Sequence, residues 1–336
     1  MSRSRMRALG PLLLWPLLLA CGLQPLDSIT PGRPLVRRGD EISACGQLFH
    51  TGTRVILWND PGGYDAYRVE PRFPEALTLD ERAAFEVKAR YHTLRKHLTD
   101  EQRARILDEG FTLDTLRDAV DLFVIHYDAC GTSRRCFQVL QDERHLSVHF
   151  LLDADGTIYQ TLDLKERAWH AASANDRSIG VEIAHIGAYP EPDHERLRRW
   201  YQVDRDGPRI VFQGGPSETG LRTEDFVARP ARPKLLSGPV HGQLLYQYDF
   251  TDAQYRALAR LTAALHAVLP RIALAVPRDE RGELLTRALS GQEFEEHSGL
   301  LGHFHVTERK VDPGPAFDWE RLLRESRKLA GPRHVP

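Results

Sequence analysis

The chain has 336 residues, of which 41% are hydrophobic and 27% are charged. This is the composition of a globular protein, and it excludes disorder over the whole length. The 45 Lys and Arg residues are balanced by 47 Asp and Glu residues, so the chain lacks the basic field that usually holds nucleic acid. We therefore expect no nucleic-acid partner.

The N-terminus has the pattern of an export signal. Several arginines precede an apolar run over residues 8–20 that is too short to span a bilayer. The run ends in Leu-Leu-Ala before Cys21, which resembles a bacterial lipobox. We expect residues 1–20 to be a lipoprotein signal peptide and Cys21 to carry a lipid anchor, with a plain secretory signal as the alternative. Gly22, rather than an aspartate, follows the cysteine. By the bacterial sorting pattern that this resembles, we expect the protein at the periplasmic face of the outer membrane rather than at the inner membrane.

Two of the three remaining cysteines lie close together. Cys130 and Cys136 enclose a short loop, so a disulfide between them is sterically easy in an oxidising compartment. The alternative is that Cys130 ligates a metal. We favour the disulfide because better metal ligands occur later in the chain. Cys45 is then left over.

The N-terminal third is predicted to lead into the folded domain. The proline-rich and glycine-rich composition of residues 21–77 predicts a tether and N-terminal extension. Residues 78–120 are predicted to be a helical lead-in. Apolar spacing indicates one helix over 78–98, beginning at Thr78 or Asp80, and caps at Thr99 and Thr112 indicate two short helices after it.

Buried strands are predicted next. The apolar run over residues 122–125 indicates a strand covered on both faces, with His126 at its end. Residues 148–152 and 157–160 flank an Asp-Gly turn and predict a β-hairpin. Residues 179–183 predict another buried strand.

The C-terminal part combines an irregular insertion with helices. Residues 188–249 are rich in proline and glycine with little periodicity, and we expect a loop-rich insertion that faces the substrate. Residues 251–269 have helical spacing, and a final helix follows Asp318. Strands that alternate with helices predict an α/β domain over residues 121–330, with a mixed central β-sheet flanked by helices.

Histidines and a carboxylate supply candidate metal ligands. An imidazole such as His126, at the end of an apolar strand, is costly to bury unless something binds it. His303, His305 and Asp312 form a second cluster. If residues 303–305 are extended, both rings project from the same face. Two histidines and one carboxylate match the ligand count of a catalytic zinc site that keeps a fourth position for water.

Several short motifs, taken in order, resemble one family: the zinc-dependent N-acetylmuramoyl-L-alanine amidases related to peptidoglycan-recognition proteins. The motifs are Val-Ile-His-Tyr at 124–127, Ser-Val-His-Phe at 147–150 with Asp-Gly-Thr-Ile-Tyr at 155–159, Ala-Trp-His-Ala at 168–171, Ser-Ile-Gly-Val-Glu at 178–182, Leu-Gly-His at 301–303 and Lys-Val-Asp-Pro-Gly-Pro at 310–315. The resemblance covers residues 121–319 and implies the fold of that family. It also implies hydrolysis of the amide between N-acetylmuramic acid and L-alanine in peptidoglycan or muropeptides, for cell-wall turnover or recycling.

The resemblance also implies roles for individual residues. Zn2+ would be held by His126, His303 and Asp312 and would activate a water. Glu182 would transfer the proton, and Lys310 would stabilise the developing oxyanion.

Further site residues follow from the same motifs. Trp169 and His170 are expected to line the substrate groove, although structural packing of Trp169 is nearly as well supported. His303 is preferred to His305 as a zinc ligand because it follows a glycine, as in the family pattern. A disulfide beside the first ligand strand of recognition proteins supports the same bond between Cys130 and Cys136.

Two departures from the family pattern stand out. The spacing from His303 to Asp312 is one residue shorter than expected, and the loop over residues 188–249 is longer than in the smallest amidases. The main competing interpretation is a lipoprotein that binds peptidoglycan without cleaving it. Such family members lose a zinc ligand, whereas this sequence retains the full set. A serine hydrolase is disfavoured because the sequence has no Gly-x-Ser-x-Gly motif.

Overall fold

The structure is a computed structural model that describes residues 31–32, 34–68, 70–71, 73, 75, 77–83, 94–214 and 219–331. Its contacts divide the chain into two units. The helices and strands of the described residues all belong to the second unit, which starts at Arg38. The predicted signal peptide and the predicted lipid attachment at Cys21 lie outside the described residues. In the part of the chain that is described, no helix is long and apolar enough to cross a membrane.

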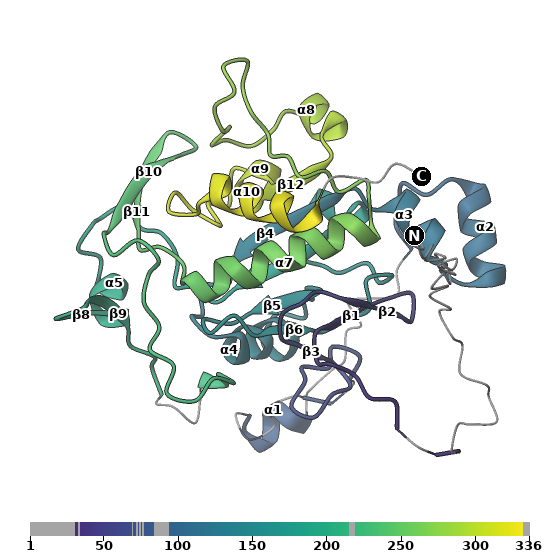
Figure 1. Cartoon of the computed structure of the whole chain (residues 1–336), viewed down its shortest axis with the longest axis horizontal. Coiled ribbons are helices and arrows are strands. Elements are labelled where there is room, and N and C mark those ends of the chain that lie inside the picture. Colours follow the sequence, from purple (N-terminus) through teal and green to yellow (C-terminus); the bar gives the residue numbers. More distant parts are fainter. Residues whose placement is uncertain are drawn as a thin grey trace, which may run out of the picture. The chain divides into compact units, whose positions relative to one another are not determined.

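A six-stranded mixed sheet forms the centre of this unit (Figure 1), as predicted. Its strand order is β12-β4-β7-β5-β6-β3. The strands are β3 (Val55–Leu57), β4 (Leu122–Tyr127), β5 (Phe150–Leu152), β6 (Ile158–Gln160), β7 (Ser178–Ile183) and β12 (Gly299–Gly302). β12, β4, β7 and β5 run parallel, β6 is antiparallel to β5, and β3 is parallel to β6. The predicted strands over 122–125 and 179–183 and the predicted hairpin are confirmed.

The two faces of the sheet have different neighbours. Helices α7 (Asp252–Val268) and α10 (Trp319–Ala330) lie against one face, where Phe123 and Ile125 of β4 join their apolar core. Leu122 and Val124 belong to a separate cluster. Because side chains alternate along a strand, His126 projects on the side of Leu122 and Val124, away from α7 and α10.

The first helix of the predicted helical lead-in differs from the prediction, and the next two agree with it. α2 (Asp100–Glu109) and α3 (Leu113–Ala119) begin after Thr99 and Thr112, whose hydroxyls accept backbone N–H groups as expected. Within the described residues, α1 spans Leu79–Ala83, and residues 94–99 are not helical. The helix predicted over residues 78–98 therefore ends before its predicted C-terminus.

Arg95 explains this difference. Its side chain is fully buried, and its guanidinium donates hydrogen bonds to the carbonyls of Leu164, Glu166, Asn175, Asp176 and Ser178. These contacts hold the segment around Arg95 against the residues that lead into β7 and against its first residue. Such a role is invisible in the local helical pattern, in which an arginine is an ordinary surface residue.

The folded body starts earlier than composition indicates. β1 (Glu41–Ala44) and β2 (Gln47–His50) form a hairpin, and β3 joins the central sheet. The Asp163 carboxylate accepts hydrogen bonds from the Ser43 hydroxyl and from the backbone N–H groups of Cys45 and Gly46. Residues 41–57 are thus part of the domain, which the prediction of a tether over residues 21–77 missed.

The insertion contains more regular structure than predicted. It holds α5 (Glu195–Trp200) and two antiparallel hairpins, β8 (Tyr201–Asp204) with β9 (Gly207–Ile210) and β10 (Leu236–Val240) with β11 (Gln243–Gln247). Figure 1 shows these elements gathered on one side of the sheet. The remaining short helices are α4 (Ser133–Gln138), η3 (Val139–Glu143), η4 (Ala172–Asp176), α8 (Gly291–Glu296) and α9 (His303–Val306).

Candidate metal centre

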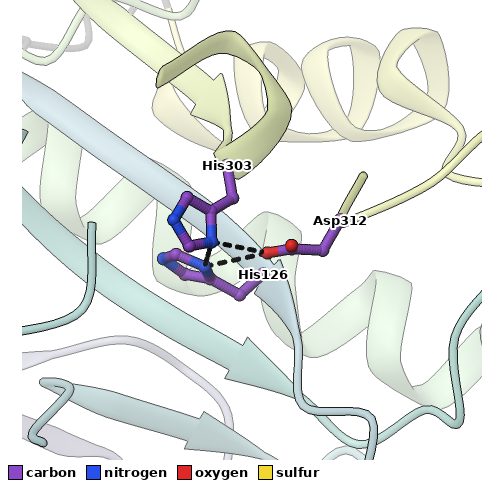
Figure 2. A group of neighbouring side chains, drawn as sticks. All are labelled: His126, His303 and Asp312. Carbon is purple, nitrogen blue, oxygen red and sulfur yellow. Dashed lines mark hydrogen bonds and ion pairs between the residues drawn. The ribbon is translucent and has the colours of Figure 1, made fainter. Parts of the chain in front are cut away.

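Three predicted ligands, far apart in sequence, meet at one edge of the sheet. His126 lies near the end of β4, His303 begins α9, and Asp312 lies in the loop before α10 (Figure 2). β12 pairs with β4 so that Gly302 stands opposite Ile125, which brings the next residue of each strand together. The three residues are 1%, 7% and 6% exposed.

The three side chains direct one atom each towards a common point. The Nδ1 atoms of His126 and His303 are 3.0 Å apart, and Asp312 Oδ2 lies 2.9 Å and 3.1 Å from them. Zinc bonds of about 2.0–2.1 Å in a tetrahedral site place neighbouring ligand atoms about 3.3–3.4 Å apart. The observed triangle is therefore close to one face of such a tetrahedron, and these residues fit a divalent metal.

The protonation states also suit a metal. Burial lowers the pKa of His126 to about 4, so its imidazole is neutral at neutral pH. Burial alone would raise the pKa of Asp312, but His303 and His126 hold it well below its usual range. A neutral imidazole and an ionised carboxylate are the forms that bind metal.

His305 does not join this cluster. The extended conformation considered for residues 303–305 is not found, because these residues begin the short helix α9. Positions two apart on a helix point in very different directions. His305 Nδ1 accepts the Gly302 N–H at 2.9 Å, and its Nε2 donates to the Leu285 carbonyl at 2.7 Å.

Glu182 lies beside the cluster. It stands opposite His126 in the parallel pairing of β4 with β7, so the two side chains project from the same face. Its Oε2 atom is buried and has no hydrogen-bond partner among the described residues. Burial raises the pKa of Glu182 well above its usual range, and the Asp312 carboxylate adds to this effect. A carboxyl group whose pKa is raised beside a metal site is suited to general acid–base catalysis.

Lys310 supplies a positive charge close to the same point. It is half-buried, two residues before Asp312. Its charge opposes the rise that burial causes in the pKa of Glu182, and it adds to the fall that burial causes in the pKa of His126. His241 donates from Nε2 to the Lys310 carbonyl at 2.8 Å, which helps to fix the backbone there.

His170 contacts a predicted ligand directly. Its Nδ1 lies 3.0 Å from His126 Nε2, and its Nε2 lies 3.2 Å from the Ser178 hydroxyl. The ring packs on Gly180, where an added Cβ would come within 2.5 Å of it. Sequence reasoning assigned His170 to the substrate groove and missed this contact, although a glycine inside a buried strand is a signal of close approach.

Trp169 contacts residues outside the metal cluster. Its backbone N–H donates to the Ser147 hydroxyl at 2.9 Å, and the Arg167 guanidinium lies 5.6 Å from the centre of its ring. These contacts fit the packing role left open above. A groove-lining role for Trp169 stays a prediction.

Cys130 and Cys136 are both thiols in the structure. Burial raises the pKa of Cys136 well above its usual range, and a hydrogen bond with the Cys130 side chain adds to this effect. The two sulfur groups therefore face each other across the short loop. The bond predicted between them stays a prediction.

Comparisons with known proteins find relatives of the chain. Over 186 residues the chain is 26% identical to the 1,6-anhydro-N-acetylmuramyl-L-alanine amidase AmpD of Salmonella typhimurium, and 25% identical to AmpD of Escherichia coli. These matches cover 53% of this chain and 55% and 56% of the relatives. The chain thus spans a little more than half the length of these curated relatives.

A solved structure of AmiD from Escherichia coli, in complex with the substrate anhydro-N-acetylmuramic acid-L-Ala-D-γ-Glu-L-Lys, is 20% identical. That match covers 61% of this chain and 57% of AmiD, with a TM-score of 0.33. The family model described as N-acetylmuramoyl-L-alanine amidase, Amidase_2, matches residues 116–315. This range is more than half of the chain and includes every residue of the metal cluster, so the chain belongs to the N-acetylmuramoyl-L-alanine amidase family.

Proposed function

We propose that this protein is a zinc-dependent amidase that cleaves the bond between N-acetylmuramic acid and L-alanine in peptidoglycan or muropeptides, for cell-wall turnover or recycling. The observation that carries the proposal is the convergence of His126, His303 and Asp312 within 3.1 Å of one another, with Glu182 in register beside them. The family match and the AmpD relatives support the bond that is cleaved.

In this proposal His126, His303 and Asp312 hold Zn2+ through Nδ1, Nδ1 and Oδ2. When bound, zinc supplies a water that is nucleophilic at neutral pH and an electrophile for the scissile carbonyl. With Nδ1 of His126 used as a ligand atom, its Nε2 carries the proton and donates to His170 Nδ1. His170 thereby fixes the ring orientation of His126.

Glu182 carries the proton through the reaction. Its carboxylate accepts a proton from the attacking water and delivers it to the amide nitrogen, so that L-alanine leaves as an amine. In this proposal the Lys310 ammonium offsets the negative charge that develops on the carbonyl oxygen. The oxygen of the attacking water bonds to the carbonyl carbon, and cleavage of the carbon–nitrogen bond then leaves a carboxylate on the muramic acid and an amine on L-alanine.

A non-catalytic peptidoglycan-binding lipoprotein is the alternative. Binding members of the family are expected to lack a zinc ligand, but here all three candidate ligands, Glu182 and Lys310 gather at one edge of the sheet. This convergence favours hydrolysis.

The test is digestion of purified sacculi and of soluble muropeptides by the purified protein, with mass spectrometry of the products. We expect free stem peptides that begin with L-alanine, together with glycan or muramic acid that lacks peptide. Intact substrates under zinc-replete conditions would contradict the proposal, and cleavage at another bond would redirect it.

We also propose that Cys21 anchors the protein by lipid to the periplasmic face of the outer membrane, and that Cys130 and Cys136 form a disulfide there. The sequence pattern supports the anchor, and the facing thiols support the disulfide. Cys21→Ser should move the protein from the membrane fraction to the soluble periplasm. Unchanged fractionation would contradict the anchor.

A further inference from the structure

A cavity of about 850 Å³ lies beside the loop that follows β4. One wall comes from this loop and from α4, and the opposite wall comes from the insertion. The lining residues used below are Cys130, Arg134, Arg196, Arg199, Trp200 and Gln213. None of them belongs to the metal cluster.

The cavity adjoins the edge of the sheet that carries the catalytic groups. Asp128, which follows β4, accepts hydrogen bonds from the N–H groups of Cys130 and Gly131 at 2.9 Å. The same Oδ1 atom accepts the N–H of His185, which follows β7, at 3.0 Å. Cys130 also lies close enough to Glu182 to influence the pKa of its carboxyl group. A ligand in the cavity is therefore a neighbour of the scissile bond.

Guanidinium groups dominate the charge of the lining. Four arginines face two glutamates, Glu75 and Glu195. Arg134 pairs with Glu75 at 3.6 Å, and Arg135 pairs with Glu143, outside the lining, at 2.6 Å. The remaining two arginines, Arg196 and Arg199, lie on α5 together with Glu195, so the insertion side of the cavity keeps a net positive charge.

Arg196 and Arg199 are one helical turn apart on α5 and exposed. Neither has a carboxylate partner within ion-pair distance in the described part of the chain. Arg196 donates to the Tyr189 hydroxyl at 3.3 Å, and Arg199 donates from Nε to Gln213 at 2.9 Å. Neutral partners orient the two groups and leave their charges available to an anion.

An apolar surface lies next to these charges. The Trp200 ring packs directly on Gly131, where an added Cβ would come within 2.4 Å of it. Gly131 has a φ of +81°, which favours glycine for a second reason. The packing holds α5 against the loop after β4, so the two arginines keep a fixed distance from the catalytic edge.

We propose that Arg196 and Arg199 bind free carboxylates of the substrate's stem peptide, on the peptide side of the scissile amide. This inference rests on the proposed function and names the part of the substrate that the insertion recognises. A stem peptide such as L-Ala-D-γ-Glu-L-Lys carries an α-carboxylate on its γ-linked glutamate and another at its C-terminus. Guanidinium groups match planar carboxylates with two parallel hydrogen bonds, and an apolar wall beside them suits the methylene groups of the peptide.

The first experiment measures KM and kcat of the full-length mature protein on a muropeptide with free carboxylates and on its amidated counterpart. The double variant Arg196→Gln/Arg199→Gln should raise KM for the free acid about tenfold, a change typical of losing a hydrogen bond to a charged group, with kcat much less affected. On the amidated substrate, the double variant should resemble the wild type. Equal KM values for wild type and double variant on the free acid would overturn the inference.

A matched control lies on the same helix. Arg198 is 64% exposed, pairs with Asp193 at 3.5 Å and does not line the cavity. Arg198→Gln removes the same charge from the same turn and should leave KM unchanged. An equal rise in KM for this control would assign the effect to net charge and overturn a specific site.

Direct binding separates this inference from the proposed function. Calorimetry with the peptide L-Ala-D-γ-Glu-L-Lys should show binding to the wild type that the double variant loses, whether or not the protein cleaves any amide. Cleavage without such a difference would refute only the carboxylate site, and binding without cleavage would refute only the amidase. Inorganic phosphate that competes as well as the peptide would identify a general anion site and contradict the peptide assignment.

Discussion

The metal cluster and the insertion cavity are built in opposite ways. The cluster is carried by buried strands and by segments that pack on them, and its three candidate ligands are at most 7% exposed. The cavity wall is a short helix with exposed arginines, held by Trp200 and by neutral hydrogen-bond partners. Under the two proposals above, the sheet would fix the chemistry, which governs kcat, and the appended insertion would tune substrate affinity, which governs KM.

The largest effect is expected from removing a candidate ligand. His303→Ala opens the triangle around the proposed zinc position, so the protein should lose tightly bound metal and nearly all amidase activity. His305→Ala is the matched control, because its two hydrogen bonds lead to Gly302 and Leu285. It should lower stability but retain one equivalent of zinc by elemental analysis. The opposite ranking of zinc content would show that the cluster is wrongly assigned.

Glu182→Gln should produce the next largest loss. The amide is isosteric but cannot take up the proton, so kcat should fall about 10²–10⁴-fold. Zinc content and thermal unfolding should remain close to those of the wild type, since Glu182 is not among the ligands. Normal turnover in this variant would move proton transfer to another group.

A substitution of His170 tests whether a residue outside the three candidate ligands supports metal binding. His170→Ala removes the partner of His126 Nε2, and zinc affinity should fall about 10–100-fold. His170→Gln offers an oxygen that can accept the same N–H and should recover part of the affinity. Competition with a chromophoric chelator measures both, and wild-type affinity in the alanine variant would reduce His170 to a packing residue.

Asp128 joins the two regions, and its titration should affect stability more than chemistry. Burial raises the pKa of Asp128 to about 7, although hydrogen bonds from four backbone N–H groups oppose the shift. The unfolded chain loses this proton near pH 4, so the contribution of Asp128 to stability should fall as pH rises from about 4 to about 7 and then level off. Asp128→Asn should remove this fall, which amounts to no more than a few kcal/mol. Urea unfolding across this pH range measures it, and an unchanged pH slope would contradict the shift.

The sequence predicted the sheet best where hydrophobicity is continuous. β4 and β7 are apolar runs buried on both faces, and α7 and α10 follow clear helical spacing. His126 was identifiable because it is a polar residue at the end of such a run. The residue types of the metal cluster were equally visible, since two histidines and a carboxylate are an unusual set near a strand end.

Other features depend on contacts that no local pattern contains. β3 is only three residues long, in a segment whose glycines and prolines resemble a tether. The helical conformation at His303 depends on long-range pairing, in which the Phe304 N–H donates to the Asp312 carbonyl. The buried roles of Arg95 and His170 likewise arise from partners distant in sequence. The hairpins of the insertion escaped prediction because their strands are short and mostly exposed, with no hydrophobic alternation to reveal them.

The most direct test of the proposed zinc site is a zinc titration of the chelator-stripped protein, with metal content and muropeptide cleavage measured on the same samples. We predict no cleavage without metal, recovery in proportion to bound zinc, and saturation at one equivalent, with the new amine at L-alanine. Full activity of metal-free protein, or one bound zinc without any cleavage, would contradict the central claim that His126, His303 and Asp312 form a catalytic zinc site.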